Sequence, residues 1–509
     1  MKNELRMGET QNPCERRTPA LQYAKNTGRA PTCRQSRKVF QSQLILFLAL
    51  LAGAATAGLF ALQDGESPRG EAVVSLGEQT VDPAEWGKLF PRQYEDYLRA
   101  SERGASDKTA ADKLEENPRL KILFAGHSYV ADYRAGRGHS YMLSDLRDTL
   151  RAKSPYSQTG ACIQCHSSNV AVYRSQGIAD GAPGSSSDPL TSANGYAQLF
   201  RGFEKVSKMP FEQAAKLVSH PAACIDCHEP KTMKLRVTRP AFITAIRALA
   251  ASEATAAQFQ SIERWRKGNR SEPYDPNEAA TRQEMRSFVC GQCHSEYYAG
   301  PEATLFYPWN NGLKADEIEY YYNSYMPAGE PLLSDWRHED SGAYLLKAQH
   351  PEFELWSQGM HSPLGVSCAD CHMPTVKEGD KEASDHRMSS PLSGKMEACQ
   401  NCHETPVNEI KFRIEDIQER TDKMLRRAED AVIVLIREIV SAKNAGLEDM
   451  QLQEAFEFHR GAQWRLDFVG SENSMGVHAS GEALRLLTEA LDYAVRGRTV
   501  VQNMMLKIR

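Results

Sequence analysis

The cysteines of this 509-residue chain carry its clearest chemical pattern. Ten of the 12 cysteines fall in five copies of one motif, two thiols separated by two residues and followed directly by a histidine: Cys162-Ile-Gln-Cys165-His166, Cys224-Ile-Asp-Cys227-His228, Cys290-Gly-Gln-Cys293-His294, Cys368-Ala-Asp-Cys371-His372 and Cys399-Gln-Asn-Cys402-His403. Two thiols at this spacing can form thioethers to one porphyrin, and the adjacent histidine then becomes an axial ligand of its iron. The pattern predicts five c-type haems.

One such motif alone would also fit a redox dithiol or half of a zinc site. A zinc site needs paired cysteine units that close a tetrahedron, which would leave the histidine without a role. Because the histidine is present in all five copies, we interpret them as haem attachment sites. The remaining cysteines, Cys14 and Cys33, are interpreted as ordinary thiols near the N-terminus.

Nine of the 14 histidines lie outside these motifs: His127, His139, His220, His338, His350, His361, His386, His459 and His478. Electron carriers usually fill both axial positions of each iron, whereas a catalytic haem keeps one open. Four of the nine stand beside small, flexible or polar residues in loop-like sequence, and we predict them as distal ligands: His139, His361, His386 and His478. Four distal ligands for five irons leave one haem five-coordinate.

The sequence changes in character after Thr405. No cysteine follows, and apolar residues recur at the spacing of a helix. This pattern predicts a long helix that ends at Asn444-Ala445-Gly446, a second from about 449 to 468 and a third from about 481 to 507. Few stretches before Thr405 alternate as strands do. The predicted fold class is therefore mainly α, a multihaem cytochrome c with few strands and a long C-terminal helical region.

An export signal precedes the predicted folded part. Residues 44–62 are uncharged, and the basic residues of 1–43 keep that leader in the cytoplasm by the positive-inside rule. The apolar segment is of marginal spanning length, so it is a signal anchor or a signal peptide cleaved after Ala57. Either alternative makes the functional part periplasmic. If residues 44–62 are not cleaved, they anchor the protein to the inner membrane. We expect a linker over 63–85, the pentahaem catalytic region over 86–405 and a dimer surface on the helices of 406–509.

The charge balance narrows the class of partner. With 61 Lys and Arg against 66 Asp and Glu, the net charge is -5. This balance excludes nucleic acid and an anionic membrane surface as the principal partner. Any anionic substrate must be attracted by local charge.

Several segments together resemble the ammonia-forming cytochrome c nitrite reductases, over most of the chain from Trp86 onward. They are Arg137-Gly-His139 with Asp145, Thr149-Leu-Arg151, Val289–Tyr298, Tyr307–Gly312, Lys347–Glu352, Val366–Pro374, Gln463-Trp464-Arg465 with Asp467, and Gly476-Val-His478. Many cytochromes share CxxCH, but CGQCHSEYY together with KAQHPE is far more specific. The resemblance implies a six-electron reduction of nitrite to ammonium, in which four haems deliver electrons to the fifth.

The resemblance also implies a catalytic pocket of Arg151, Tyr297 and His350 over the open iron. A guanidinium can hold an anion, an imidazole can relay protons, and a phenol can donate a hydrogen bond. From the residues alone, Arg151 would be a surface helix charge and Tyr297 a core aromatic residue.

A calcium site is implied by the same resemblance. Its ligands would be the Glu296 carboxylate, the Gln349 side-chain oxygen and the carbonyls of Tyr297 and Lys347, all oxygen donors as a hard cation requires. A salt bridge between Glu296 and Lys347 is the competing interpretation.

The chain departs from the resemblance at its first haem motif. Many members of the family carry lysine there as the proximal ligand, whereas this chain has His166. The sequence therefore leaves open the electronic properties of the iron bound by His166 and the preferred substrate. The alternatives are a pentahaem electron-transfer cytochrome without catalysis, and a reductase of hydroxylamine, nitric oxide or sulfite.

The partners implied by the resemblance are nitrite, a second copy of the chain, and an electron donor. The second copy would form a homodimer through the terminal helices. The donor would be a membrane-bound, quinol-oxidising multihaem cytochrome or a soluble equivalent.

Overall fold

The computed structural model describes residues 75–99, 112–153, 156, 158–299, 304–324, 333–379, 381–393 and 396–508. All of these belong to one compact unit, Val73–Arg509. The predicted leader, the apolar segment 44–62, Cys14, Cys33 and the first part of the linker lie outside the described residues. In the part that is described, we find no helix that could span a bilayer.

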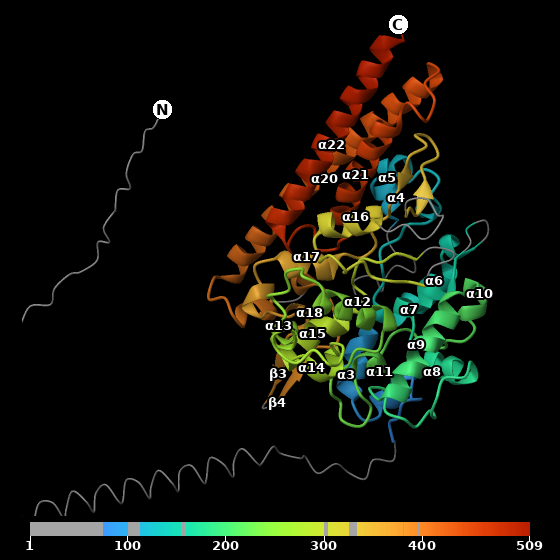
Figure 1. Cartoon of the computed structure of the whole chain (residues 1–509). Coiled ribbons are helices and arrows are strands. Elements are labelled where there is room, and N and C mark those ends of the chain that lie inside the picture. Colours follow the sequence, from blue (N-terminus) through green and yellow to red (C-terminus); the bar gives the residue numbers. More distant parts are fainter. Residues whose placement is uncertain are drawn as a thin grey trace, which may run out of the picture. The chain divides into compact units, whose positions relative to one another are not determined.

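The mainly α fold predicted from the sequence is confirmed (Figure 1). Before the C-terminal region the α-helices are α2 (Pro83–Gly87), α3 (Pro91–Arg99), α4 (Lys113–Glu116), α5 (Arg119–Leu123), α6 (Met142–Asp148), α7 (Ile163–His166), α8 (Val170–Ala179), α9 (Ala193–Ser207), α10 (Phe211–Ala214), α11 (Cys224–Cys227), α12 (Pro240–Ala251), α13 (Gln260–Lys267), α14 (Pro276–Ala279), α15 (Arg282–Gly291), α16 (Ala315–Ser324), α17 (Glu352–Gln358), α18 (Cys368–His372) and α19 (Glu397–Gln400). Short 3-10 helices are η1 (Ser128–Val130), η2 (His139–Tyr141), η3 (Leu150–Ala152), η4 (Gly160–Cys162), η5 (Ser362–Leu364) and η6 (Pro391–Ser393).

The strands of the described residues form two small antiparallel ribbons. One pairs β1 (Trp336–Arg337) with β2 (Tyr344–Leu345), and the other pairs β3 (Thr375–Glu378) with β4 (Lys381–Ser384). Neither ribbon is extensive enough to form a core, so helix packing and the connecting segments must position the haem motifs.

Three long helices form the C-terminal region and run alongside one another: α20 (Val407–Asn444), α21 (Gln453–Gly470) and α22 (Ser480–Lys507) (Figure 1). The predicted end of the first helix agrees with the structure, where Gly446 has a φ of +96° and terminates the turn. The second helix begins later than predicted. The Gln451 side chain accepts a hydrogen bond from the Glu448 amide (2.9 Å), which favours a turn before Gln453.

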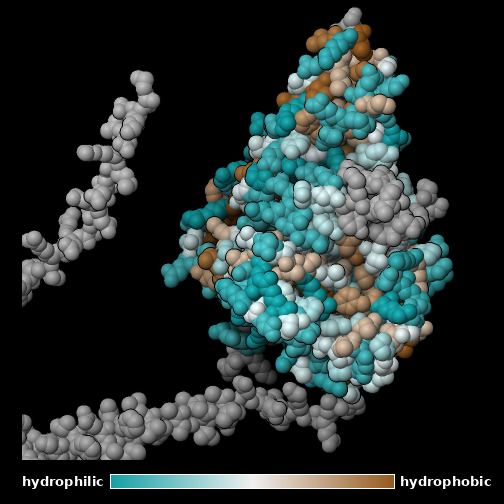
Figure 2. Space-filling model, viewed as in Figure 1, coloured by the Kyte–Doolittle hydropathy of each residue, from teal (hydrophilic) through white to brown (hydrophobic). Residues whose placement is uncertain are grey.

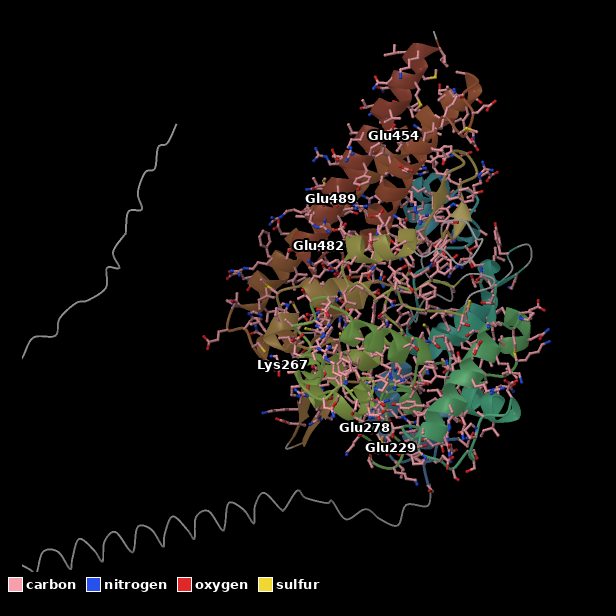
Figure 3. All side chains as sticks on the ribbon, viewed as in Figure 1. Glu229, Lys267, Glu278, Glu454, Glu482 and Glu489 are labelled. Carbon is pink, nitrogen blue, oxygen red and sulfur yellow. The ribbon has the colours of Figure 1, made fainter. Side chains whose placement is uncertain are left out.

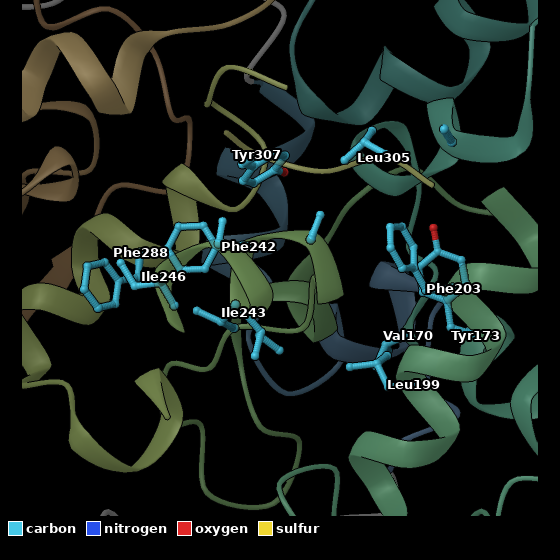
Figure 4. Packing of buried hydrophobic residues seen from close by; sticks show 14 of the residues in the cluster. Val170, Tyr173, Leu199, Phe203, Phe242, Ile243, Ile246, Phe288, Leu305 and Tyr307 are labelled. Carbon is cyan, nitrogen blue, oxygen red and sulfur yellow. The ribbon is translucent and has the colours of Figure 1, made fainter. Parts of the chain in front are cut away.

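The haem-motif region has its own apolar core. Phe242, Ile243 and Ile246 on α12 are buried and lie between Phe288 of α15 and the α8–α9 pair (Figure 4). Helices α8 and α9 approach so closely that a Cβ on Gly202 would lie 1.7 Å from the Tyr173 carbonyl oxygen. This packing supports the segments that carry the first two motifs.

Charged and polar side chains dominate the visible surface (Figure 2). On the C-terminal helices, Glu482 and Glu489 of α22 (Figure 3) form ion pairs with Arg485, and Glu489 also pairs with Arg465 of α21. Apolar residues are visible at the far end of these helices (Figure 2), where Met450 and Leu506 are 82% and 69% exposed.

Candidate haem sites and anion pocket

Each haem motif is folded as a helical turn, and in three of them the histidine amide donates to the carbonyl of the first cysteine. These distances are 2.9 Å in the second motif, 3.0 Å in the third and 2.9 Å in the fifth. A helical turn brings positions i, i+3 and i+4 to one face, so both thiols and the imidazole are presented together. All ten motif cysteines are free thiols. The donor set therefore fits covalent haem.

Four of the motif histidines face a second histidine ring. The ring centroids lie 6.4 Å apart for His228 and His386, 6.1 Å for His294 and His139, 6.2 Å for His372 and His478, and 6.3 Å for His403 and His361. One metal ion with two metal–nitrogen bonds of about 2 Å each fits between rings at this separation. The second members of these pairs are the four histidines predicted as distal ligands.

His166 of the first motif differs from the other four. Within the described residues no histidine ring faces it at such a separation. Its Nδ1 lies 3.2 Å from the Met142 carbonyl oxygen, as Nδ1 of His228 lies 2.8 Å from that of Met233. Such contacts fix the ring orientation and leave Nε2 for a metal. The structure thus supplies four paired sites and one unpaired site.

His294 has a second histidine neighbour, because the His350 ring lies 6.3 Å away. The Glu352 carboxylate lies beside Nδ1 of both rings, at 4.0 Å from His294 and 3.8 Å from His350. His350 therefore approaches the Nδ1 side of His294, and Nε2, the atom that a haem iron would bind, is left to His139.

Two glycines explain how distal histidines reach their positions. Gly138, directly before His139, has a φ of +106°, which favours glycine. A Cβ on Gly359 would lie 1.9 Å from the His478 carbonyl oxygen, so only glycine permits this close approach.

The Glu472 carboxylate lies 2.6 Å from Nδ1 of His478 and raises the pKa of that imidazole, although burial acts in the opposite direction.

Arg151 is held by the loop that precedes it. The Thr149 hydroxyl accepts from the Arg151 amide (3.4 Å) and donates to Asp132 (2.6 Å). Asp132 also accepts from the Leu150 amide at 3.0 Å. Within the described residues the guanidinium has no carboxylate partner, and its Nε is buried without a hydrogen bond. It lies instead 4.3 Å from the ring centre of Tyr129. Arg151 is therefore a cation left free to bind an anion.

The three predicted pocket residues gather around the first motif. Burial lowers the pKa of His166 to about 4, the Met142 contact opposes this change, and the nearby His350 and Arg151 add to it. Burial also raises the pKa of Tyr297 well above its ordinary value, with Tyr129 and the two cysteines of the first motif contributing. The Tyr297 phenol therefore stays protonated and can donate a hydrogen bond.

The predicted calcium ligands also lie close together. The Glu296 carboxylate accepts from the Gln349 amide N–H (2.7 Å), and the Gln349 side chain donates to the Lys347 carbonyl (3.1 Å). Glu296 accepts further from the Tyr322 hydroxyl at 3.0 Å. No cluster of three or more His, Cys, Asp or Glu side chains able to hold a metal occurs in the described part of the chain.

The competing salt bridge between Glu296 and Lys347 is not formed. Lys347 is fully buried and lies 2.8 Å from Asp467 of α21, and it also donates to Ser471 Oγ at 2.7 Å. The Lys347 ammonium therefore neutralises Asp467, and the hydrogen-bond donors to the Glu296 carboxylate are all neutral.

A cavity of about 940 Å³ lies between α9, α12 and residues 304–307. Its cations are Arg201 and Lys205, which pair with Asp180 at 2.7 and 3.7 Å, and Lys208, which pairs with Glu204 at 3.0 Å. This cavity offers no uncompensated positive charge to an anion, so we do not place the site there.

Several residues that contribute to the site could not be predicted from the sequence. Tyr129, Asp132 and Asp467 act across large sequence separations, as in the contact between Tyr129 and Gln349. No spacing rule connects residues so far apart. Asp467 is the exception, because it lies in a segment that carries the resemblance to the family.

Comparison with known proteins identifies the family of the chain. Residues 82–508 match the family model described as cytochrome c552. The chain belongs to the cytochrome c552 family. Within it, a cytochrome c-552 from Bacteroides fragilis is 31% identical over 430 residues, covering 82% of this chain and 76% of the relative. One from Maridesulfovibrio salexigens is 31% identical over 437 residues, covering 82% and 75%.

A solved structure shows the same fold. It is the catalytic subunit of cytochrome c nitrite reductase from Desulfovibrio desulfuricans, described with two calcium sites. It is 25% identical, has a TM-score of 0.65, and the match covers 84% of this chain and 87% of that one. The resemblance inferred from the sequence is thereby confirmed, and the chain is a haem-binding c-type cytochrome of the cytochrome c552 family.

Proposed function

We propose that this cytochrome c552 holds five haems and reduces nitrite to ammonium at the first of them. Four haems would have two histidine ligands each, from the pairs His228–His386, His294–His139, His372–His478 and His403–His361. The fifth would be bound by His166 alone. The observation that carries the proposal is that Arg151, a cation without a carboxylate partner among the described residues, lies in the group around the unpaired His166.

The chain's own residues would bind the anion and manage its protons. Arg151 would hold nitrite by charge and paired hydrogen bonds. Tyr297 would donate a hydrogen bond, and the His350 imidazole would deliver protons. The haem would supply the electrons and an iron position open to the substrate. The net reaction consumes six electrons and eight protons and releases ammonium and two waters.

A calcium ion beside this pocket is part of the proposal. The buried Glu296 carboxylate accepts only neutral donors among the described residues, which is unfavourable for a buried charge. If the Gln349 amide turned to present its oxygen, the Glu296, Gln349 and Lys347 oxygens would suit a hard cation, with the Tyr297 carbonyl as a fourth ligand. The nitrite reductase from Desulfovibrio desulfuricans is described with calcium sites.

Location and partners follow from the same proposal. The chain would act in the periplasm, anchored by residues 44–62 or released after their cleavage. A membrane quinol-oxidising multihaem cytochrome or a soluble donor would supply electrons, and α20 and α22 would form the homodimer surface.

The direct test uses purified, haem-loaded protein with reduced viologen as donor. We expect nitrite consumption and ammonium release in equal amounts. Protein with all five haems that releases no ammonium would contradict the proposal and favour the electron-carrier alternative. Competition with hydroxylamine, nitric oxide and sulfite then determines whether His166 has changed the preferred substrate.

A further inference from the structure

We propose that Tyr129 is a positioning residue that holds the two halves of the anion pocket together. This inference rests on the proposed function, because it concerns the same pocket. One half, Arg151, comes from η3, and the other, Gln349 with His350, comes from the segment before α17. Tyr129 in η1 contacts both, with its ring 4.3 Å from the Arg151 guanidinium and its hydroxyl 3.3 Å from Gln349 Oε1.

The aromatic ring holds Arg151 without neutralising it. A carboxylate in this place would compete with an anionic ligand for the guanidinium, whereas the face of a phenol attracts the cation and carries no net charge. Lys347 lies 4.9 Å from the same ring, but its charge is already compensated by Asp467. The free charge beside Tyr129 is therefore that of Arg151.

The ring itself is fixed by its neighbours. His127 stacks on it with a centroid separation of 5.1 Å and an angle of 17° between the planes. Tyr133 packs perpendicular to it at 4.6 Å. The Tyr129 amide also donates to Nδ1 of His127 at 3.3 Å. A ring confined in this way restricts the position of the guanidinium above it.

The Tyr129 hydroxyl makes a second contact, with the Gln349 side chain. A phenol can donate to an amide oxygen or accept from an amide nitrogen, so this contact persists in either orientation of the Gln349 side chain. Gln349 is adjacent to His350, and the contact therefore restrains the segment that carries the proton-delivering imidazole. Substitutions that remove only the hydroxyl, or the ring as well, test these two contacts.

The experiment compares Tyr129→Met and Tyr129→Phe with wild type, using haem-loaded protein. Tyr493→Met is the matched control, because the Arg465 guanidinium lies 4.4 Å from the Tyr493 ring on the C-terminal helices. Optical titration of the oxidised protein gives the Kd for nitrite and azide, and titration of the reduced protein gives that for the neutral ligand nitric oxide. We expect Tyr129→Met to weaken both anions about tenfold, the effect of losing a desolvated cation–aromatic contact. Nitric oxide affinity should be unchanged.

Restoration by phenylalanine separates positioning from general damage. Tyr129→Phe should bind nitrite like wild type, with kcat lowered about threefold by the loss of one hydrogen bond. Wild-type anion affinity in Tyr129→Met, or equal loss of nitric oxide affinity, would overturn the role of the ring. If Tyr129→Met fails to load haem, an unchanged kcat in Tyr129→Phe would still overturn the role of the hydroxyl.

The binding titrations also separate this inference from the proposed function. If wild type makes no ammonium while Tyr129→Met selectively loses anion affinity, the positioning role stands and the proposed reaction fails. If wild type makes ammonium and Tyr129→Met binds anions normally, the positioning role fails and the reaction stands.

Discussion

At the scale of a residue, the contacts of Arg151 decide between two interpretations of its side chain. From the sequence alone it would be a surface charge. In the structure its Nε is buried without a hydrogen bond, and no carboxylate among the described residues neutralises it. A partly buried cation in this state favours an anionic ligand.

We predict that Arg151→Gln weakens nitrite binding and lowers kcat/KM by roughly a hundredfold, the effect of losing a charged donor to an anion. Haem content should remain at five per chain. Steady-state viologen assays measure the change, and Arg201→Gln, which removes an exposed charge on α9, is the matched control. Equal activity in both variants would remove Arg151 from the pocket.

A second residue-scale prediction concerns His350. We expect His350→Ala to keep all haems while lowering turnover strongly, since proton delivery to the bound anion would be lost. Haem quantification and ammonium assays measure the two effects. Unchanged turnover would show that the imidazole has another role.

The pH dependence of stability tests the environment of Glu354. Burial raises its pKa to about 8, although its carboxylate accepts from Trp309 (2.7 Å) and from the Glu296 amide (3.0 Å). The folded protein therefore keeps a proton that the unfolded chain loses, and stability should fall as pH rises from about 4.5 to 8, by about 1.4 kcal/mol for each pKa unit.

Glu354→Gln should remove this pH dependence, because an amide oxygen accepts the same hydrogen bonds without ionising. Urea midpoints at pH 5 and pH 8.5 provide the measurement. Glu454→Gln, at an exposed position of α21, should behave like wild type. A slope that persists in Glu354→Gln would assign the pH effect to other groups.

At the scale of elements, a buried ion pair connects the pocket segment to the C-terminal helices. Lys347 and Asp467 lie 2.8 Å apart, and Asp467 also accepts from the Ala348 amide at 2.8 Å. This pair fixes the backbone on which Gln349 and His350 stand. The C-terminal helices therefore help to position the pocket.

We predict that Asp467→Asn destabilises the protein by about 3–5 kcal/mol, because it leaves a buried ammonium without its counter-charge. Denaturant unfolding at neutral pH measures the loss. Asp492→Asn, which breaks an exposed pair with Arg496 on α22, should change stability by less than about 0.5 kcal/mol. Equal effects would mean that Lys347 is compensated in another way.

Helices with a local sequence pattern could be predicted from the sequence, whereas contacts between elements far apart in the chain could not. The 3.6-residue periodicity predicted α20, α21 and α22, and small, flexible or polar neighbours led us to predict four of the nine remaining histidines as distal ligands. Periodicity says nothing of which ring faces which, so the pairing of His386 with His228 required the structure. The contacts of Tyr129 with Arg151 and Gln349 depend on tertiary packing and have no local signature.

At the scale of the whole molecule, the structure arranges four paired histidine sites and one unpaired site in a fold that the cytochrome c552 family shares. The paired sites suit electron transfer, because both axial positions of each iron would be filled. The unpaired site has the only open position in this arrangement, and the pocket residues gather there. The proposed catalysis would therefore depend on a single haem.

Electron paramagnetic resonance of the oxidised, fully haem-loaded protein tests this dependence most directly. Our account predicts one high-spin haem among low-spin ones, and a change in the high-spin signal when nitrite is added. A spectrum in which every haem is low-spin and unaffected by nitrite would contradict it.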